Sequence, residues 1–200
     1  MIGVPKNWNK KMTLLPIALR GKILQKKHLK DIQLSVSGKL LLMQVLKEFD
    51  LPLSLSNLEY HTHHRPFFKA GFDFNIAHSG NMVICCGTTN GKVGADIERI
   101  QPINFNNYTD YFTGNEWQNI LNSDDPTNAF LNFWTRKEAV LKAAGTGFFT
   151  PLQEIDVTDD ILNYDNCTYY LHQLTLHNAY QCHIAATVEQ DISTIAVKHL

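Results

Sequence analysis

Apolar residues recur at three- and four-residue spacing in three stretches of the chain, and this spacing predicts helices. The first stretch, 14–30, carries basic residues on its outer face, and the second, 31–49, is apolar enough to be buried. The third follows Asp125, which can cap a helix, and ends at Gly145, which supplies a left-handed stop. Pro126 suits the first turn, so this helix is predicted to begin there.

Apolar and polar residues alternate in other stretches, which predicts strands. These stretches are 72–79, 82–88, 93–100, 155–157, 168–176, 180–188 and 194–197. The Asn90–Gly91 pair is a strong hairpin signal, so the first three strands are expected to form an antiparallel meander. Thr113 and Glu116 have the spacing of a capping box and predict a further short helix.

Each half of the chain therefore consists of helix followed by hairpin strands, which suggests an internal duplication. The fold class expected from this order is α+β. We place the boundary between the halves at 103/104, with 1–103 as the N-terminal half and 104–200 as the C-terminal half.

The charges nearly balance, with 18 basic and 19 acidic side chains, so net charge does not favour a nucleic-acid or membrane-surface protein. No apolar run approaches the length of a membrane span, and we expect a cytoplasmic protein. The four cysteines lack C-x-x-C spacing, which favours reduced structural thiols.

Acidic residues suggest a site for a hard cation. On a strand, Asp96 and Glu98 point to the same side, roughly 7 Å apart, and such a pair can hold Mg²⁺ together with phosphate oxygens. Glu138 and Lys142 share a helix face with large aromatic residues. Taken singly, each pair has an ordinary alternative, namely a solvated strand face and an exposed ion pair.

Potential anion contacts lie upstream. The strand ending at His78 and Ser79 presents an imidazole, a hydroxyl and backbone N–H groups together. Arg65 precedes Pro66, which stiffens the backbone there, so its guanidinium suits bidentate binding of a phosphate and equally an ordinary surface loop.

The ordered set of motifs resembles one enzyme family. In sequence order these are Arg65-Pro66, FNIAHSG, VGADIE, YFTGNEW and FWTRKEAVLKAAGTGF. Together they resemble the 4'-phosphopantetheinyl transferase superfamily, in its surfactin-type branch of about two hundred residues. The resemblance implies a pseudo-dimer of two similar halves, each with a small antiparallel sheet packed on helices, and an active site in the cleft between them.

The resemblance also implies an activity, the transfer of the 4'-phosphopantetheine arm of coenzyme A to a serine of an apo acyl or peptidyl carrier protein. Mg²⁺ would be held by Asp96, Glu98 and Glu138, and adenosine 3',5'-bisphosphate would be released. The serine proton would go to Glu138, directly or through a metal-bound water, or to Glu116; sequence leaves this choice open. A monomer, with no nucleic acid or membrane partner, is expected.

The family pattern assigns several residues to coenzyme A. They are Arg65, His78, Ser79, Lys137 and Lys142, with Arg20 and Lys22 as looser N-terminal matches. One departure is the His64-Arg65-Pro66 sequence in place of the family's Gly-Lys-Pro, and a second is the absence of the family's arginine before Gly38. Two other functions remain as alternatives, a metal-dependent phosphohydrolase or nuclease and a non-catalytic module that binds coenzyme A or a carrier protein.

Overall fold

The computed structural model describes residues 7–60, 65–69, 71–147 and 151–189. Its helices are α1 (Trp8–Met12), α2 (Ile17–Leu24), α3 (Leu29–Glu48), η1 (Leu55–Asn57), η2 (Phe105–Tyr111), α4 (Gly114–Leu121), α5 (Pro126–Ala144) and η4 (Leu152–Glu154). Its strands are β1 (Glu59–Tyr60), β2 (Pro66–Phe67), β3 (Asp73–Ser79), β4 (Met82–Thr88), β5 (Val93–Arg99), β6 (Ile161–Tyr164), β7 (Cys167–Gln173) and β8 (Tyr180–Ala186). The mixture of helices and antiparallel sheets confirms the predicted α+β class.

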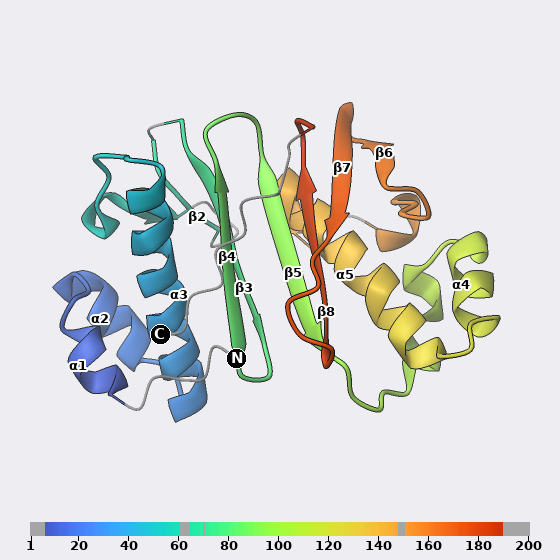
Figure 1. Cartoon of the computed structure of the whole chain (residues 1–200), viewed down its shortest axis with the longest axis horizontal. Coiled ribbons are helices and arrows are strands. Elements are labelled where there is room, and N and C mark those ends of the chain that lie inside the picture. The colour runs from blue at the N-terminus through green and yellow to red at the C-terminus, as the bar shows by residue number, and fades with distance from the viewer. Residues whose placement is uncertain (1–6, 61–64, 70, 148–150, 190–200) are drawn as a thin grey trace.

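Two sheets form the middle of the molecule, and helices cover them (Figure 1). β3 and β4 pair with each other, and the second sheet has the order β5-β8-β7-β6, antiparallel throughout. Helix α3 lies against β3 and β4, while α5 lies against β5 and β8. The division at 103/104 stays a prediction, and β5 pairs across it with a strand of the C-terminal half.

The predicted meander is wrong at its second step, because β5 pairs with β8 and lies beside β3, whereas β4 pairs with β3. Side chains of β3 occupy the edge of β5: Asp73 accepts the N–H of Val93, Asn75 that of Ala95 and Ser79 that of Arg99. These bonds run in the same direction along both strands, so β3 and β5 are parallel neighbours joined through side chains. Turn chemistry at Asn90–Gly91 sets the bend but not the strand's partner.

The C-terminal strands also differ from the prediction. Residues 155–157 form no strand, because side chains of α4 and α5 bind their backbone: Val157 donates to Glu116, and Ile155 and Val157 accept from Lys137 and Arg136. Strand β6 was not predicted; it turns into β7 at Asp165 and Asn166, both with positive φ. The predicted strand at 194–197 lies outside the described residues.

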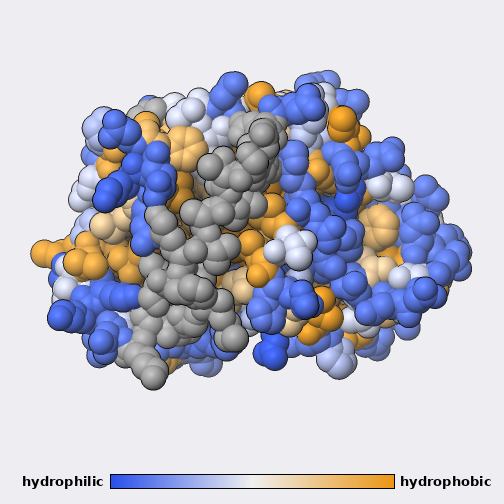
Figure 2. All heavy atoms as spheres, viewed as in Figure 1, coloured by the Kyte–Doolittle hydropathy of each residue, from blue (hydrophilic) through white to orange (hydrophobic). Residues whose placement is uncertain are grey.

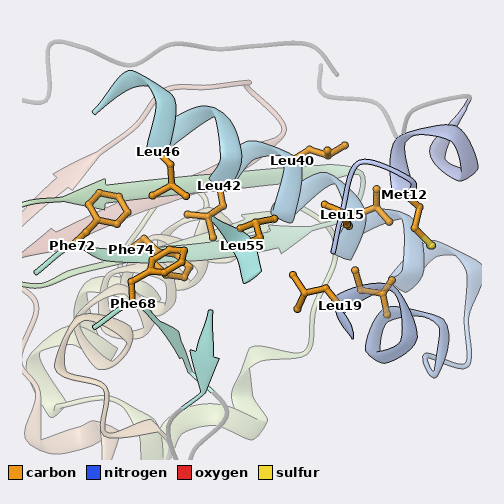
Figure 3. Packing of buried hydrophobic residues seen from close by; sticks show 12 residues of the cluster. Met12, Leu15, Leu19, Leu40, Leu42, Leu46, Leu55, Phe68, Phe72 and Phe74 are labelled. Carbon is orange, nitrogen blue, oxygen red and sulfur yellow. The ribbon is translucent and has the colours of Figure 1, made fainter. Parts of the chain in front are cut away.

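The core has an apolar cluster on the helix side of each of these two sheets, and a further cluster, with Ala77 and Ile184 among its members, joins the two sheets. One lies between α1, α2, α3 and β3 (Figure 3), and its labelled members are Met12, Leu15, Leu19, Leu40, Leu42, Leu46, Leu55, Phe68, Phe72 and Phe74. Gly38 permits the approach of α3, because a Cβ there would lie 2.8 Å from Ile76 Cγ2. Another cluster joins α5 to β7 and β8. Helix α3 thus packs on the β3-β4 sheet, and helix α5 packs on the β5-β8-β7-β6 sheet.

Apolar side chains also reach the surface at the α1–α2 end, where Figure 2 shows an orange patch on the left flank. Leu14 and Ile17 are exposed there. Among the described residues, no helix is both long and apolar enough to cross a bilayer.

Candidate active site

Helix α5 carries Glu138 and Lys142, and its ends are set by the predicted residues. Asp125 Oδ1 accepts the N–H of Asn128 at 3.0 Å, and Gly145 ends the helix with a φ of 75°. The ordinary interpretation of an exposed Glu138–Lys142 pair is wrong, because Glu138 is only 7% exposed and Lys142 instead binds Asp96 across the interface with β5.

Strand β5 brings its carboxylates to α5 because Gly94 has no side chain. A Cβ at Gly94 would lie 2.1 Å from the carbonyl oxygen of Ala139 and 2.3 Å from the amide nitrogen of Ala143. The strand therefore touches the helix backbone itself. Two residues further on, Asp96 Oδ1 lies 2.5 Å from Lys142 Nζ. The close approach at Gly94 therefore sets the distance between the two acidic motifs, which are Asp96 with Glu98 on β5 and Glu138 on α5.

Burial perturbs both carboxyl groups at this contact. It raises the pKa of Asp96 to about 6, against the opposing charge of Lys142. It raises the pKa of Glu138 to about 7, again opposed by Lys142 and reinforced by the negative charges of Asp96 and Glu98. Asp96 Oδ2 and Glu138 Oε1 are buried without a hydrogen-bond partner among the described residues. Unpartnered buried acceptors are costly, so this position favours a cationic ligand.

The end of β3 completes this face. Ser79 Oγ donates to Glu98 Oε2 at 2.6 Å and accepts the N–H of Arg99 at 3.1 Å. His78, on the same strand, is only partly exposed, and the partial burial of its ring together with the charge of Lys142 lowers its pKa. Ser79 thus contacts one of the predicted carboxylates, that of Glu98, and His78 lies within the electrostatic reach of Lys142.

The carboxylate cluster, meaning Asp96, Glu98 and Glu138, fits a hard divalent cation by its chemistry. All its donors are oxygens, which Mg²⁺ prefers, and two of them lack any partner in the described chain. No group of three or more His, Cys, Asp or Glu side chains among the described residues is already gathered closely enough to hold a metal ion. In this structure the ammonium of Lys142 supplies the positive charge beside Asp96 instead.

Glu116 and Lys137 are brought together elsewhere, in the interior. Their side chains are 0% exposed and form an ion pair of 2.8 Å. Glu116 also accepts the N–H groups of Thr113 at 2.8 Å and Val157 at 2.9 Å, while Lys137 donates to the carbonyls of Leu152 and Ile155. These contacts confirm the predicted capping box and give both residues a structural role. They favour Glu138 over Glu116 as the base and leave Lys137 without a free donor for a phosphate.

The predicted N-terminal contacts are dispersed. Arg20 donates to the carbonyls of Leu15 and Thr13 at 2.7 and 2.6 Å, and Lys22 lies 4.2 Å from the ring centre of Tyr60. Both are on α2, on the flank of the molecule opposite α5 in Figure 1. Their role as coenzyme A contacts stays a prediction.

A buried histidine lies next to Asp96 on the neighbouring strand β8. His183 is the cross-strand partner of Asp96, and its Nδ1 lies 2.8 Å from Thr135 Oγ1, with both residues fully buried. Burial lowers the pKa of His183 to about 3, and the charge of Arg136 adds to this effect. The position of His183 beside Asp96 becomes visible only once β5 and β8 pair.

Comparison with known proteins identifies the family. A sequence model of the 4'-phosphopantetheinyl transferase superfamily matches residues 92–192, half of the chain, and contains both acidic motifs. The chain belongs to this superfamily. Its similarity to the two relatives described next places the chain in the surfactin-type branch of the superfamily.

Two curated relatives show the extent of the match. The 4'-phosphopantetheinyl transferase gsp of Aneurinibacillus migulanus is 31% identical over 128 residues, which is 62% of this chain and 54% of the relative. The transferase Sfp of Bacillus subtilis is 29% identical over 135 residues, or 65% of this chain and 60% of the relative. This chain therefore matches little more than half the length of these relatives.

A solved structure, the holo-[acyl-carrier-protein] synthase of Thermotoga maritima, aligns with a TM-score of 0.39 at 13% identity. The alignment covers 50% of this chain and 64% of the synthase. A likeness at this level carries no argument about the site, which rests on the geometry described above.

Proposed function

We propose that this protein is a Mg²⁺-dependent 4'-phosphopantetheinyl transferase that moves the phosphopantetheine arm of coenzyme A onto a serine of an apo carrier protein. The observation that carries the proposal is the carboxylate cluster facing Lys142, with two buried carboxylate oxygens that lack a partner among the described residues. It occurs in a chain whose family relatives are named for this transfer.

Asp96, Glu98 and Glu138 would hold the Mg²⁺. Bound there, the ion would neutralise negative charge on the pyrophosphate of coenzyme A. Lys142, on α5, donates a hydrogen bond to Asp96. In the complex with coenzyme A, Lys142 would leave Asp96 and would contact the phosphates as a mobile point charge.

Glu138 is the better candidate for the base. One carboxylate oxygen of Glu138 has no hydrogen-bond partner among the described residues, whereas both carboxylate oxygens of Glu116 are engaged by Lys137 and by backbone N–H groups. It would accept the proton of the carrier serine as the serine oxygen bonds to the β-phosphorus. The bond between that phosphorus and the bridging oxygen breaks, and adenosine 3',5'-bisphosphate leaves with the bond's electron pair. Glu116 keeps its interior contacts throughout.

The carrier protein would approach from the side of η2. Tyr111 is 41% exposed there, and its ring packs on Trp134 of α5 at 6.0 Å. Phe112 is buried in the same aromatic cluster and so belongs to the core. We expect a monomer in the cytoplasm, with the site formed within one chain.

The experiment uses a fluorescent coenzyme A analogue labelled on its thiol, and purified apo acyl and peptidyl carrier proteins. With Mg²⁺, wild-type protein should attach the label to a carrier, whereas Asp96→Asn and Glu138→Gln should lose about 100-fold or more of the rate. Glu154→Gln, which removes an exposed acid, is the control and should retain the wild-type rate. Full activity in either site variant would refute the assignment of these residues. Carrier-independent cleavage of coenzyme A would instead support a phosphohydrolase.

A further inference from the structure

Arg65 makes four hydrogen bonds that connect three elements of the fold. Nη1 donates to the carbonyl oxygens of Lys142 at 2.5 Å and Ala143 at 3.1 Å. Nη2 donates to Asp73 Oδ2 at 2.7 Å and to the carbonyl oxygen of Val93 at 3.1 Å. A guanidinium has four N–H groups on its two terminal nitrogens, and these acceptors account for all four.

The two carbonyls on α5 belong to its last turn, where a helix has no internal donors for them. A positive charge at this end is also favourable, because it opposes the helix dipole. Gly145 follows directly, and a Cβ there would lie 3.3 Å from Arg65 Nη1. The guanidinium therefore caps α5 from outside, at the residue whose side chain contacts Asp96.

Asp73 joins this cap to the strand that carries the other acidic motif. Its Oδ2 accepts from Arg65 and, at 2.8 Å, from the N–H of Val93, the first residue of β5. The side chains of Arg65 and Asp73 are only 14% and 11% exposed. The ion pair thus binds the beginning of β5 and the end of α5, the two elements that bear the carboxylate cluster and Lys142.

We propose that Arg65 and Asp73 form a clamp that positions α5 against β5, and that Arg65 is a positioning residue and not a ligand of a coenzyme A phosphate. Bidentate binding of a phosphate would require two N–H groups of the fork to be free, whereas every terminal N–H of Arg65 already has a protein acceptor. The catalytic part of this inference rests on the proposed transferase function, while the structural part does not.

Two conservative variants test the clamp. Arg65→Lys keeps the charge but replaces the fork with a single ammonium, and Asp73→Asn removes the charge while keeping an oxygen acceptor for Val93. Lys69→Gln is the control, because it removes a basic partner from an ion pair with Glu59 whose side chains are 75% and 46% exposed. Thermal midpoints without ligands, kcat and the KM for coenzyme A are measured for each variant.

The clamp predicts that both variants lower the thermal midpoint, by on the order of 5–10 °C, while the control leaves it unchanged. It also predicts a lower kcat at nearly unchanged KM for coenzyme A, and a double variant no worse than the poorer single one. If Arg65 were instead a ligand of a coenzyme A phosphate, Arg65→Lys would keep most of its activity. Asp73→Asn, which removes a negative charge, would then have the wild-type kcat and a KM for coenzyme A equal to or lower than that of the wild type.

Either wild-type midpoints in both variants or a rise in KM alone with Arg65→Lys would overturn the clamp. The midpoints need neither coenzyme A nor a carrier protein, so they judge the clamp even if the wild-type protein transfers nothing. Failure of the clamp and failure of the proposed function are thereby distinguishable.

Discussion

Replacing Gly94 with alanine should separate the two acidic motifs. The added Cβ would lie 2.1 Å from the carbonyl oxygen of Ala139 and 2.3 Å from the amide nitrogen of Ala143. Ordinary contact begins near 3.4 Å, and both atoms belong to the backbone of α5, so no side chain can move aside. The helix must retreat from β5 by on the order of 1 Å.

The size of the effect follows from this displacement. Overpacking of this kind costs about 1–3 kcal/mol, which corresponds to a fall in thermal midpoint of roughly 2–12 °C for a chain of this size. Activity should suffer more, because a misplacement of about 1 Å in a catalytic group can cost on the order of 100-fold. Glu138 and Lys142 move with the helix, whereas Asp96 and Glu98 stay on the strand.

The assay compares Gly94→Ala with Gly21→Ala, in which a Cβ meets no atom within 4 Å. Thermal unfolding and the rate of carrier modification are measured for both variants. Gly21→Ala should equal or exceed wild-type stability at full activity, since alanine favours a helix interior. Wild-type stability and activity in Gly94→Ala would refute the argument that direct contact between β5 and α5 sets the site geometry.

Further predictions concern the interior. Glu116→Gln should cost about 3–5 kcal/mol, because it leaves the ammonium of Lys137 buried without its charge partner; in urea unfolding, adding Lys137→Met should recover part of the loss, and a fully additive loss would contradict the pairing. Burial lowers the pKa of His183 from 6.5 to about 3, so the folded protein binds a proton at this residue less readily than the unfolded chain does. The contribution of neutral His183 to the free energy of unfolding is therefore complete above pH 6.5 and declines as the pH falls towards 3. His183→Gln should therefore flatten the decline in unfolding free energy that the wild type shows below pH 6.5. An unchanged slope of unfolding free energy against pH would contradict this role of His183. Trp134→Ala should cost about 3 kcal/mol, since the ring contacts Tyr108, Tyr111, Phe112 and Phe130, and a chemical-denaturation midpoint equal to that of wild type would show that these contacts contribute little.

Features with local causes could be predicted from the sequence. Helix α5 is bounded by Asp125 and Gly145, whose effects on the backbone involve only their immediate neighbours. The shared direction of Asp96 and Glu98 follows from the two-residue period of a strand. The capping box of Thr113 and Glu116 spans a single turn. For this reason, both acidic motifs could be assigned to the correct elements.

Features that depend on distant partners could not be predicted. The turn at Asn90–Gly91 has hairpin chemistry, yet β5 takes its neighbours from side chains of β3 and from β8. Arg65 has the residue type of a phosphate ligand, but its partners on α5 lie 77 and 78 positions away in the chain. Lys137 and Lys142 stand in one motif, and only the fold shows that one is enclosed with Glu116 while the other reaches Asp96.

The most direct test of the proposed function is the intact mass of an apo carrier protein after incubation with this protein, coenzyme A and Mg²⁺. The account predicts a gain of one phosphopantetheine mass, matched mole for mole by adenosine 3',5'-bisphosphate, and no gain when Mg²⁺ is chelated or when Glu138→Gln replaces the wild-type protein. An unchanged mass for both acyl and peptidyl carriers, or an equal gain with Glu138→Gln, would contradict it.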